Sequence, residues 1–308
     1  MALLRDLARL GTIAAVAQAQ FCTASAVSQQ LTALEREAGV PLLRRRGRGV
    51  VLTAAGAELA ERTEGVLALL EEASAALAST ASELSGELRI GAFPTAVRTL
   101  LPAALVALGA AHPRLELHVT EVDPAHAPAA LHAGVLDIAL VHEYDYVPAE
   151  PDPALDRQPL LAEPMYLAGA LPSAEASDGT DAVRASRDRP WIVASPGTLC
   201  HLMAVRLCQA AGFAPRIRHY ADDFAAVLTL VAAGQGVAVV PALALADCPD
   251  GVALAPLAVI RRTLIACRRG ATGHPAVAAG ASAIQTAAAR YPGPRAGRPA
   301  SFSFWSPP

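Results

Sequence analysis

The spacing of apolar residues changes near Gly86, and this change divides the chain into two parts of different architecture. Before it, apolar residues recur at steps of three and four, which is the spacing of one face of an α-helix. After it, β-prone runs such as ELRIGAF, RLELHVTEV and LDIALVH alternate with helical runs, the order of an α/β domain. A chain of 308 residues has room for both parts as separate domains.

A helix-turn-helix followed by a wing is predicted in the first 56 residues. Leucines at helical spacing form a first helix that ends at Gly11, and Thr12 and Thr23 are placed to cap two further helices. Gly39 ends the third helix, and the run VPLLRRRGRGVVLT after it is typical of a two-stranded hairpin. A helix delivered by a tight turn fits the major groove of DNA.

The third predicted helix, residues 23–39, has two different faces. Its apolar stripe consists of Val27, Leu31, Leu34 and Ala38. The other face carries short polar groups, which suit base edges, and the wing carries arginines, which suit phosphates or the minor groove. We expect DNA contacts from Ser25, Ser28, Gln29, Thr32, Arg36, Arg45, Arg46 and Arg48. The alternative is an ordinary solvated surface helix.

Positive charge is concentrated in the same segment. Residues 1–56 hold seven arginines and three carboxylates, whereas the whole chain has a net charge of -3. The chain contains no lysine, so each of these charges is a guanidinium, although coding bias also explains that absence. A small basic head on an acidic body predicts a polyanionic partner for the head alone.

A long helix is predicted from Ala54 to about Leu84, a stretch without proline. Positions 59, 63, 66, 70, 73, 77, 80 and 84 hold mostly apolar residues at alternating steps of four and three, the spacing of a coiled-coil seam. We expect this helix to join two copies of the chain. The alternative is a helix packed on its own domain.

Two similar α/β lobes are predicted after Gly86. The second lobe begins with the run EPMYLAGAL and a polar loop to Arg189, continues with the strand PWIVAS, and ends near the strand GVAVVP. Crossover segments near residues 142–163 and 262–270 would join the lobes, and a last helix at about 275–290 would return to the first lobe. Loops at strand ends and helix N-termini converge between such lobes, so we expect a ligand there.

Candidate ligand contacts lie at these converging ends. They combine hydroxyls at helix N-termini, where free N–H groups favour a carboxylate or another anion, with side chains at strand ends and in adjoining loops. The set consists of Thr95, Val141, His142, Ser195, Thr198, Asp222 and Asp223. Two alternatives stay open: the hydroxyls are only helix caps, and His142 or His201 is only structural.

Membrane proteins, metalloproteins and the common enzyme classes are disfavoured. No strongly apolar stretch reaches 18 residues and no signal-peptide pattern occurs, so we expect a cytoplasmic protein without a membrane partner. The five cysteines form no C-x-x-C pair, which favours reduced thiols and predicts no metal site. The run AGQGVAVV holds only part of a dinucleotide motif, and no nucleophile elbow, P-loop or H-E-x-x-H occurs, so we expect neither catalytic residues nor a cofactor.

The run GTIAAVAQAQFCTASAVSQQLTALEREAGVPLLRRRGRGVVLTAAG, residues 11–56, resembles the winged helix-turn-helix of LysR-type transcriptional regulators. The matching pieces include Gly11-Thr12, Ala26-Val27-Ser28, Leu34-Glu35, Pro41-Leu42-Leu43, and Leu52-Thr53 with Gly56. Further on, ELRIGAF, HPRLELHV and LHAGVLDIALV are similar to the first effector-domain lobe of that family, and CQAAGF and LVAAGQGVAVVP to its second. The resemblance covers residues 1 to about 290.

The resemblance implies a multidomain fold. A helical winged helix-turn-helix domain would occupy 1–56, a linker and dimerisation helix 57–86, and a two-lobed α/β effector-binding domain of the type 2 periplasmic-binding-protein fold 87–290. Lobe I would span about 87–142 and 268–290, lobe II about 163–265, and residues 291–308 would form a disordered tail.

The resemblance also implies the partners: promoter DNA, a small-molecule effector, RNA polymerase, and further copies of the chain in a homodimer or homotetramer. Departures from the family pattern fall in the head, at Gln20 where an apolar residue is usual, at Leu43 where phenylalanine is usual, and at Ala24 and Ser25 where glutamine or proline is usual.

The sequence therefore predicts a DNA-binding regulator in which an effector shifts the relation between dimers, and hence the spacing of the DNA-binding heads. Two other classes remain as alternatives. One is a cytoplasmic solute-binding protein whose head mediates protein contacts, and the other is an enzyme acting on a small molecule.

Overall fold

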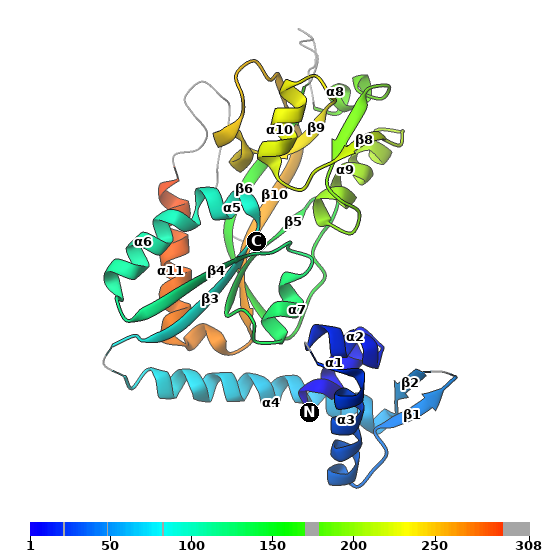
Figure 1. Cartoon of the computed structure of the whole chain (residues 1–308), viewed down its shortest axis with the longest axis vertical. Coiled ribbons are helices and arrows are strands. Elements are labelled where there is room, and N and C mark those ends of the chain that lie inside the picture. Colours follow the sequence, from blue (N-terminus) through cyan, green and yellow to red (C-terminus); the bar gives the residue numbers. More distant parts are fainter. Residues whose placement is uncertain (21, 48, 82, 170–178, 292–308) are drawn as a thin grey trace.

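The computed structural model describes residues 1–20, 22–47, 49–81, 83–169 and 179–291. A small helical head lies at one end of the molecule, helix α4 leads away from it, and a larger α/β domain with two lobes lies above both (Figure 1). This order confirms the predicted multidomain fold. The expected tail at 291–308 lies outside the described residues except for Tyr291. In the described part of the chain, no helix has both the length and the apolar character to cross a membrane.

The head contains three helices and a hairpin, called the wing below. These are α1 (Ala2–Leu10), α2 (Ile13–Ala19), α3 (Ala24–Ala38), β1 (Leu43–Arg46) and β2 (Gly49–Leu52). Both predicted caps are present, since Thr12 Oγ1 accepts from Ala15 N and Thr23 Oγ1 from Ala26 N. The core of the head consists of Leu4, Leu7, Val16, Ala17, Val27, Leu31, Leu42 and Ala60. In the predicted stripe of α3, Leu34 is only half-buried and Ala38 is exposed, because the last turn extends beyond this core.

Backbone contacts fix the wing relative to α3 and to α4 (Ala54–Ala78). Glu35 Oε1, on α3, accepts from Leu42 N at 2.8 Å and from Leu43 N at 2.9 Å. A Cβ atom at Gly56 would lie 2.1 Å from the carbonyl oxygen of Leu42, so this close approach requires glycine. Gln20, which stands where the family usually has an apolar residue, is also accommodated, because its side-chain amide donates to Asp6 Oδ2 at 2.6 Å.

Helix α4 is shorter than predicted, because it ends at Ala78 instead of near Leu84. Ser79 and Thr80 donate their hydroxyls to carbonyl oxygens of the last turn, those of Ala75 and Leu77. Such bonds compete with helix continuation. Of the predicted seam, Leu59 packs on the head and Thr63 is fully buried, whereas Val66, Leu70 and Leu77 are exposed. Leu69, next to the seam, is exposed as well.

A six-stranded mixed sheet runs through the larger domain in the order β4-β3-β5-β10-β6-β9. Strands β3 (Gly86–Ala92), β4 (Leu115–Glu121) and β5 (Ile138–Tyr144) are parallel and belong to lobe I, and β9 (Ala238–Pro241) belongs to lobe II. Strands β6 (Leu155–Ala168) and β10 (Leu254–Arg268) are antiparallel and extend through both lobes. The predicted crossover segments are therefore largely strand, because β6 and β10 complete the sheet in each lobe.

Lobe I has helices on both faces of this sheet. Helices α6 (Leu101–Ala111) and α11 (Pro275–Arg290) bury a core on one face, preceded by the short α5 (Pro94–Thr99). Helix α7 (Ala127–His132) covers a smaller core on the other face. A short 3-10 turn, η2 (Ala271–Gly273), joins β10 to α11.

Lobe II is built around the paired strands β7 (Pro190–Val193) and β8 (Arg216–Tyr220) next to β9. Its helices are α8 (Gly179–Ala185), α9 (Leu199–Ala210) and α10 (Phe224–Ala232), with the turn η1 (Ala242–Asp247) after β9. The fully buried Trp191 belongs to one of its two cores. From β7 to β9 the order of elements is the one predicted from the sequence, but α8 lies in the stretch up to Arg189 that was predicted to be a loop.

An irregularity interrupts the ladder between β6 and β10. Thr263 pairs with Leu161 and Leu264 pairs with Pro159, so Leu160 has no opposite residue. Leu160 and Leu161 both lie in the core of lobe I, which two consecutive residues of a regular strand would not do. This is a β-bulge, and bulges bend and twist the strand that contains them.

Candidate DNA-binding surface and effector site

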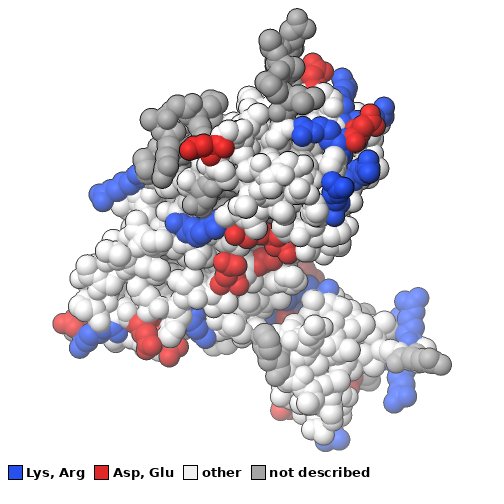
Figure 2. All heavy atoms as spheres, turned by 45° about the horizontal axis from the view of Figure 1, so that its top comes forward, with Lys and Arg blue, Asp and Glu red and all other residues white. Residues whose placement is uncertain are grey.

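The polar face of α3 is open to solvent. Ser25, Ser28, Gln29, Thr32 and Arg36 are all exposed, as predicted. The Thr32 hydroxyl donates to the carbonyl oxygen of Ser28 at 2.9 Å, so its oxygen remains available to accept from a base. On the wing, Arg44, Arg45 and Arg46 are exposed, and Figure 2 shows arginines projecting there at the edge of the head. The expected contact residue Arg48 lies outside the described residues.

A second group of polar side chains lies on one face of the central sheet, where β5, β10 and β6 run side by side. Arg261 on β10 is opposite Tyr144 on β5 and Glu163 on β6, and Thr263 is opposite His142. Residues opposite one another across a ladder share a face of the sheet. We call Tyr144, His142, Arg261, Glu163 and Thr263 the hinge cluster.

A buried ion pair forms the centre of the hinge cluster. Arg261 and Glu163 are both fully buried, and Arg261 Nη2 lies 2.6 Å from Glu163 Oε1. Arg261 also donates to Thr95 Oγ1 at 3.3 Å, and its guanidinium lies over the ring of Phe93. Burial alone would lower the pKa of Arg261, but the carboxylate of Glu163 outweighs burial and raises it, so the guanidinium is charged.

Three buried polar atoms of the hinge cluster have no hydrogen-bond partner: Arg261 Nη1, His142 Nδ1 and Thr263 Oγ1. Burial, and then the charge of Arg261, hold the pKa of His142 well below its usual value, so its ring is neutral. Buried polar groups are nearly always paired in folded proteins. Three unpaired atoms on one face of a sheet are therefore an exception, and each of them is able to bond a polar group.

The candidate residues of lobe II form a separate network at the N-termini of α9 and α10. Asp222 accepts from the backbone N and the hydroxyl of Ser195, at 2.7 and 2.8 Å. Thr198 caps α9 by accepting from His201 N, and its hydroxyl donates to the Ser195 carbonyl oxygen. Ser195 and Thr198 are thus engaged within the protein, as expected for the alternative in which they are caps.

Two contacts bring this network to lobe I. Cys200 Sγ, at the start of α9, lies 3.2 Å from Tyr144 Oη and 3.9 Å from His142 Nε2. Asp223, which caps α10, forms an ion pair with Arg98 of α5 at 3.0 Å. The structure thus gathers Thr95, His142, Ser195, Thr198, Asp222 and Asp223 around one boundary between the lobes. Val141 does not join them, because its side chain lies on the opposite face of β5 in the core under α7.

The sequence reasoning missed Arg261, Glu163 and Thr263, which lie inside apolar strands instead of at strand ends. A signal was present, since LLAEPMYL and LAVIRRTLIAC each place charge within an apolar run. Charged residues are almost never buried unless they are paired. An apolar run with a glutamate and another with arginines therefore predict a buried ion pair between two strands.

Potential metal ligands gather elsewhere, at the edge of lobe I. Glu87 on β3 is opposite Glu116 on β4, and ligand atoms of these residues and His118 lie within 4.8 Å of one another. All three side chains are exposed. We therefore regard this group as a solvated charged edge and assign no metal to it.

Comparison with known families gives matches over nearly the whole chain. The model described as "Bacterial regulatory helix-turn-helix protein, lysR family" matches residues 1–57, and the model described as "LysR substrate binding domain" matches residues 81–289. The second match includes both groups of effector candidates, and the first includes the head.

Similar proteins agree with these matches. The chain is 32% identical to a probable hydrogen peroxide-inducible genes activator of Mycobacterium avium, over 70% of this chain and 68% of that protein. It is 30% identical to the hydrogen peroxide-inducible genes activator of Dickeya chrysanthemi, over 75% and 74%. Among solved structures, a Corynebacterium glutamicum OxyR C206 mutant has 26% identity and a TM-score of 0.56, covering 93% of this chain and 89% of that one. The fold is also that of CbnR solved in complex with its target DNA, at 23% identity and a TM-score of 0.53, over 93% and 98% of the two chains.

Proposed function

The chain belongs to the LysR family of transcriptional regulators, and from this premise we propose that it reads promoter DNA with α3 and the wing and responds to a small anionic effector at the hinge cluster. Members of this family are regulators and not enzymes, so the enzyme alternative is not favoured. The place of action is the cytoplasm, where the protein associates with the nucleoid when bound to DNA and contacts RNA polymerase there.

Base recognition is assigned to the exposed polar groups of α3, and phosphate contacts to the wing. Gln29 can bond an adenine edge through two atoms, whereas Arg46 supplies charge that any sequence attracts. Replacing Arg46 by alanine should weaken binding to all sequences and reduce its salt dependence, while Gln29→Ala should relax preference at particular bases. Retardation of DNA taken from beside the protein's own gene, followed by a sequence library, measures both. If both variants lower the affinity equally for all sequences of the library, the role given to α3 is contradicted.

Pairing of two copies is assigned to α4. Val66, Leu70 and Leu77 are exposed on it at spacings of four and seven, so a second α4 would bury them. The exposed fractions of Leu70 and Leu77 are 61% and 73%, and exposed apolar side chains that lie together along one helix mark an interaction surface.

The observation that carries the effector site is the set of three unpaired buried atoms in the hinge cluster. A carboxylate would accept from Arg261 Nη1 and from the Thr263 hydroxyl, which are good donors to an anion. The neutral His142 can donate from Nδ1 to the same ligand. Because these groups are fully buried, the ligand must enter while the two lobes are further apart, and its binding favours the closed arrangement.

The names of the relatives suggest peroxide as another signal, and the geometry around Cys200 speaks against direct transfer of that role. Burial raises the pKa of the Cys200 thiol, whereas the thiolate is the reactive form. Cys208 lies on the same helix, eight residues later, at a separation of about 12 Å for an α-helix, and a disulfide needs Cα atoms within about 7 Å. A Cys200–Cys208 switch would therefore require α9 to unfold.

A thermal-shift screen of the full chain with a panel of small carboxylates and matched neutral amides tests the effector site. We expect carboxylates to raise the melting temperature, and Thr263→Val to reduce that rise with the chain still folded. Cys200→Ser should leave the carboxylate response in place. A response to hydrogen peroxide that Cys200→Ser abolishes, with no carboxylate response, would favour the peroxide alternative.

A further inference from the structure

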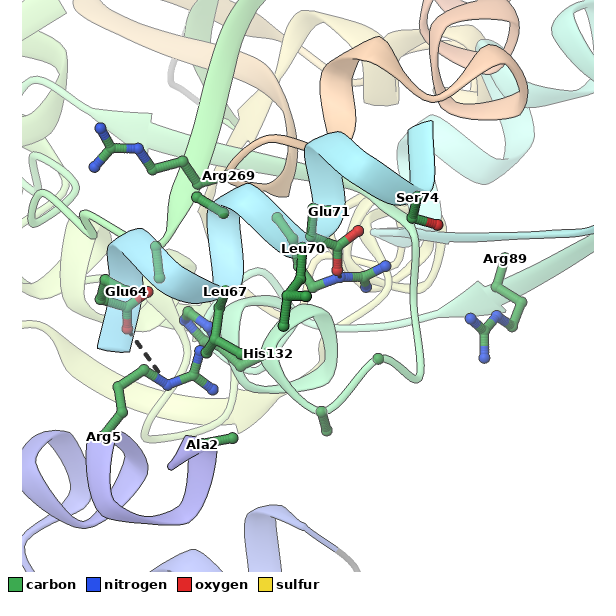
Figure 3. Close-up of a pocket in the computed structure, with 15 residues that line it drawn as sticks. Ala2, Arg5, Glu64, Leu67, Leu70, Glu71, Ser74, Arg89, His132 and Arg269 are labelled. Carbon is green, nitrogen blue, oxygen red and sulfur yellow. Dashed lines mark hydrogen bonds and ion pairs between the residues drawn. The ribbon is translucent and has the colours of Figure 1, made fainter. Parts of the chain in front are cut away.

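The head, helix α4 and lobe I meet around a cavity of about 490 Å³, which is at a distance from the hinge cluster. Its walls come from α1, from α4 and from the lobe I segments around His132 and Arg268 (Figure 3). Charged side chains surround it, and they pair across the boundaries between these three parts. We call this set of contacts the junction.

One contact of the junction joins the head directly to lobe I. The distance from Nη1 of Arg9, on α1, to Oδ2 of Asp152 is 3.6 Å. The same carboxylate oxygen lies 2.8 Å from Nε2 of His132, on α7. Asp152 comes three residues before β6 begins at Leu155. Arg9 therefore reaches the lobe I end of β6.

A second contact joins α4 to the other long strand. Arg268 is the last residue of β10, and its Nε donates to Glu71 Oε1 on α4 at 2.5 Å. The rest of its guanidinium donates to the carbonyl oxygens of Leu131 and Leu136, so the arginine is held firmly on the lobe I side. On the head side, Arg5 of α1 reaches Glu64 of α4 at 3.3 Å, the contact drawn as a dashed line in Figure 3.

Close packing of backbones accompanies the charges. Gly270, in the turn after β10, has φ +86°, and a Cβ atom there would lie 2.5 Å from the carbonyl oxygen of Ala68 on α4. The turn and the helix therefore fit together only because this residue is glycine.

The junction reaches both strands of the proposed effector site, since Arg268 is the last residue of β10 and Asp152 lies three residues before β6. Glu163 belongs to β6, and Arg261 and Thr263 belong to β10, seven or fewer residues from Arg268. Strands β6 and β10 pair with each other on both sides of the bulge at Leu160, and coupling between sites is carried by such packed secondary elements, so a change at the hinge cluster can reach the junction along them.

We propose that the junction is an ionic latch through which β6 and β10 hold the head and α4 at a fixed position relative to the sensor. The inference rests on the proposed function, since it assigns the regulation of that site. With the latch made, the separation of two heads in a dimer follows the state of the lobes. With the latch broken, each head keeps its own DNA contacts and loses its fixed position.

The latch variant is the double substitution Arg9→Ala with Glu71→Ala, which removes the contact to Asp152 before β6 and the contact to Arg268 on β10, and leaves the residues of the hinge cluster intact. The matched control is Arg62→Ala with Glu58→Ala. That pair also joins one arginine to one glutamate, but it lies on the exposed side of α4 and crosses no boundary. Both variants keep the net charge of the native chain.

Hydrogen exchange of the full-length chain, without DNA or ligand, is the first measurement. We expect faster exchange in residues 1–10 and 64–75 and at the start of β6 in the latch variant alone. Gly270→Ala should produce the same pattern by a steric route, whereas Gly212→Ala should not, because a Cβ at Gly212 meets no atom within 4 Å and its φ of +88° is similar.

DNA retardation is the second measurement. The probes are the promoter fragment and the same fragment lengthened by about half a helical turn between its half-sites. We expect the native chain and the control to prefer the natural spacing by about tenfold or more, within the usual range of coupling between sites, and the latch variant to lose most of that preference. Its affinity for a single half-site should stay within about twofold of native.

Native exchange rates and an unchanged spacing preference in the latch variant would overturn the latch. If the native chain retards no DNA, the proposed function fails, and the exchange measurement alone still decides whether the junction restrains the head.

Discussion

Arg98 of lobe I and Asp223 of lobe II meet across the boundary between the lobes, with Arg98 Nη2 3.0 Å from Asp223 Oδ1. Each side chain is more than a third exposed, so the pair contributes little to the stability of the fold. Its position is what matters, because it joins α5 to the capped end of α10 next to the hinge cluster.

We expect Arg98→Ala to change the free energy of unfolding by less than about 1 kcal/mol and yet to loosen the closed arrangement of the lobes. Hydrogen exchange at the first turn of α10 and at Ser195 should become faster. Arg62→Ala, which removes an exposed arginine from α4, is the control. If exchange at these positions is equal in the two variants, the pair does not hold the lobes together.

The buried pair of Arg261 and Glu163 should behave differently. Removing one partner leaves the other charge buried and unpaired, so Glu163→Leu should cost about 3–5 kcal/mol in urea unfolding. The double variant Glu163→Leu with Arg261→Met should be more stable than the sum of the single effects predicts. Additive losses would show that the two groups do not depend on each other.

Acid should weaken the fold through Asp152. Burial alone would raise the pKa of this carboxyl, but the hydrogen bond and charge of His132 and the charge of Arg9 outweigh burial and lower the pKa from 3.8 to about 2. A lowered pKa stabilises the fold above the unfolded pKa, and this stabilisation disappears as the pH falls through the folded pKa. Between about pH 4 and about pH 2 the native chain should therefore lose about 2 kcal/mol that Asp152→Asn does not lose. Urea unfolding across that range measures the difference, and parallel curves for the two chains would contradict it.

Oligomerisation should depend on the exposed stripe of α4. Leu70→Glu with Leu77→Glu places two charges where two helices would meet, so we expect the dimer to dissociate at concentrations at which the native chain stays associated. Gly65→Glu adds the same kind of charge to α4 away from the stripe and should leave the dimer intact. Sedimentation velocity measures all three chains. Equal association in all of them would place the interface elsewhere.

The architecture was largely predictable because its elements carry local signals. Thr12 and Thr23 cap helices, and α3, the wing and α11 lie where periodicity and turn residues placed them. The predicted end of α4 was wrong, because the apolar spacing continues past Ala78. In the structure the hydroxyls of Ser79 and Thr80 donate hydrogen bonds to carbonyl oxygens of the last helical turn. Apolar periodicity predicts which residues could share a face of a helix. It does not predict the residue at which the helix ends before the next strand.

The effector site was predictable only in part. Thr95 lies in α5 just after β3, and His142 lies near the end of β5, where α/β lobes converge, and sequence reasoning finds such positions. Arg261 and Glu163 are 98 residues apart and meet only through the pairing of β10 with β6. The junction was invisible for the same reason, because Arg9–Asp152 and Glu71–Arg268 join residues whose proximity depends on the docking of separate domains.

The bulge at Leu160 sets how the side chains on β6 before it face relative to those after it. Because alternate residues face opposite sides of a sheet, the extra residue allows Leu160 and Leu161 to fill the lobe I core while Glu163, further along the same strand, faces Arg261. Loss of this one residue would shift the strand by a single step and turn the carboxylate to the other side of the sheet. Conservative substitutions along β6 are therefore tolerable in a way that a one-residue deletion is not: the strand has a fixed length, and that length is part of what specifies the site.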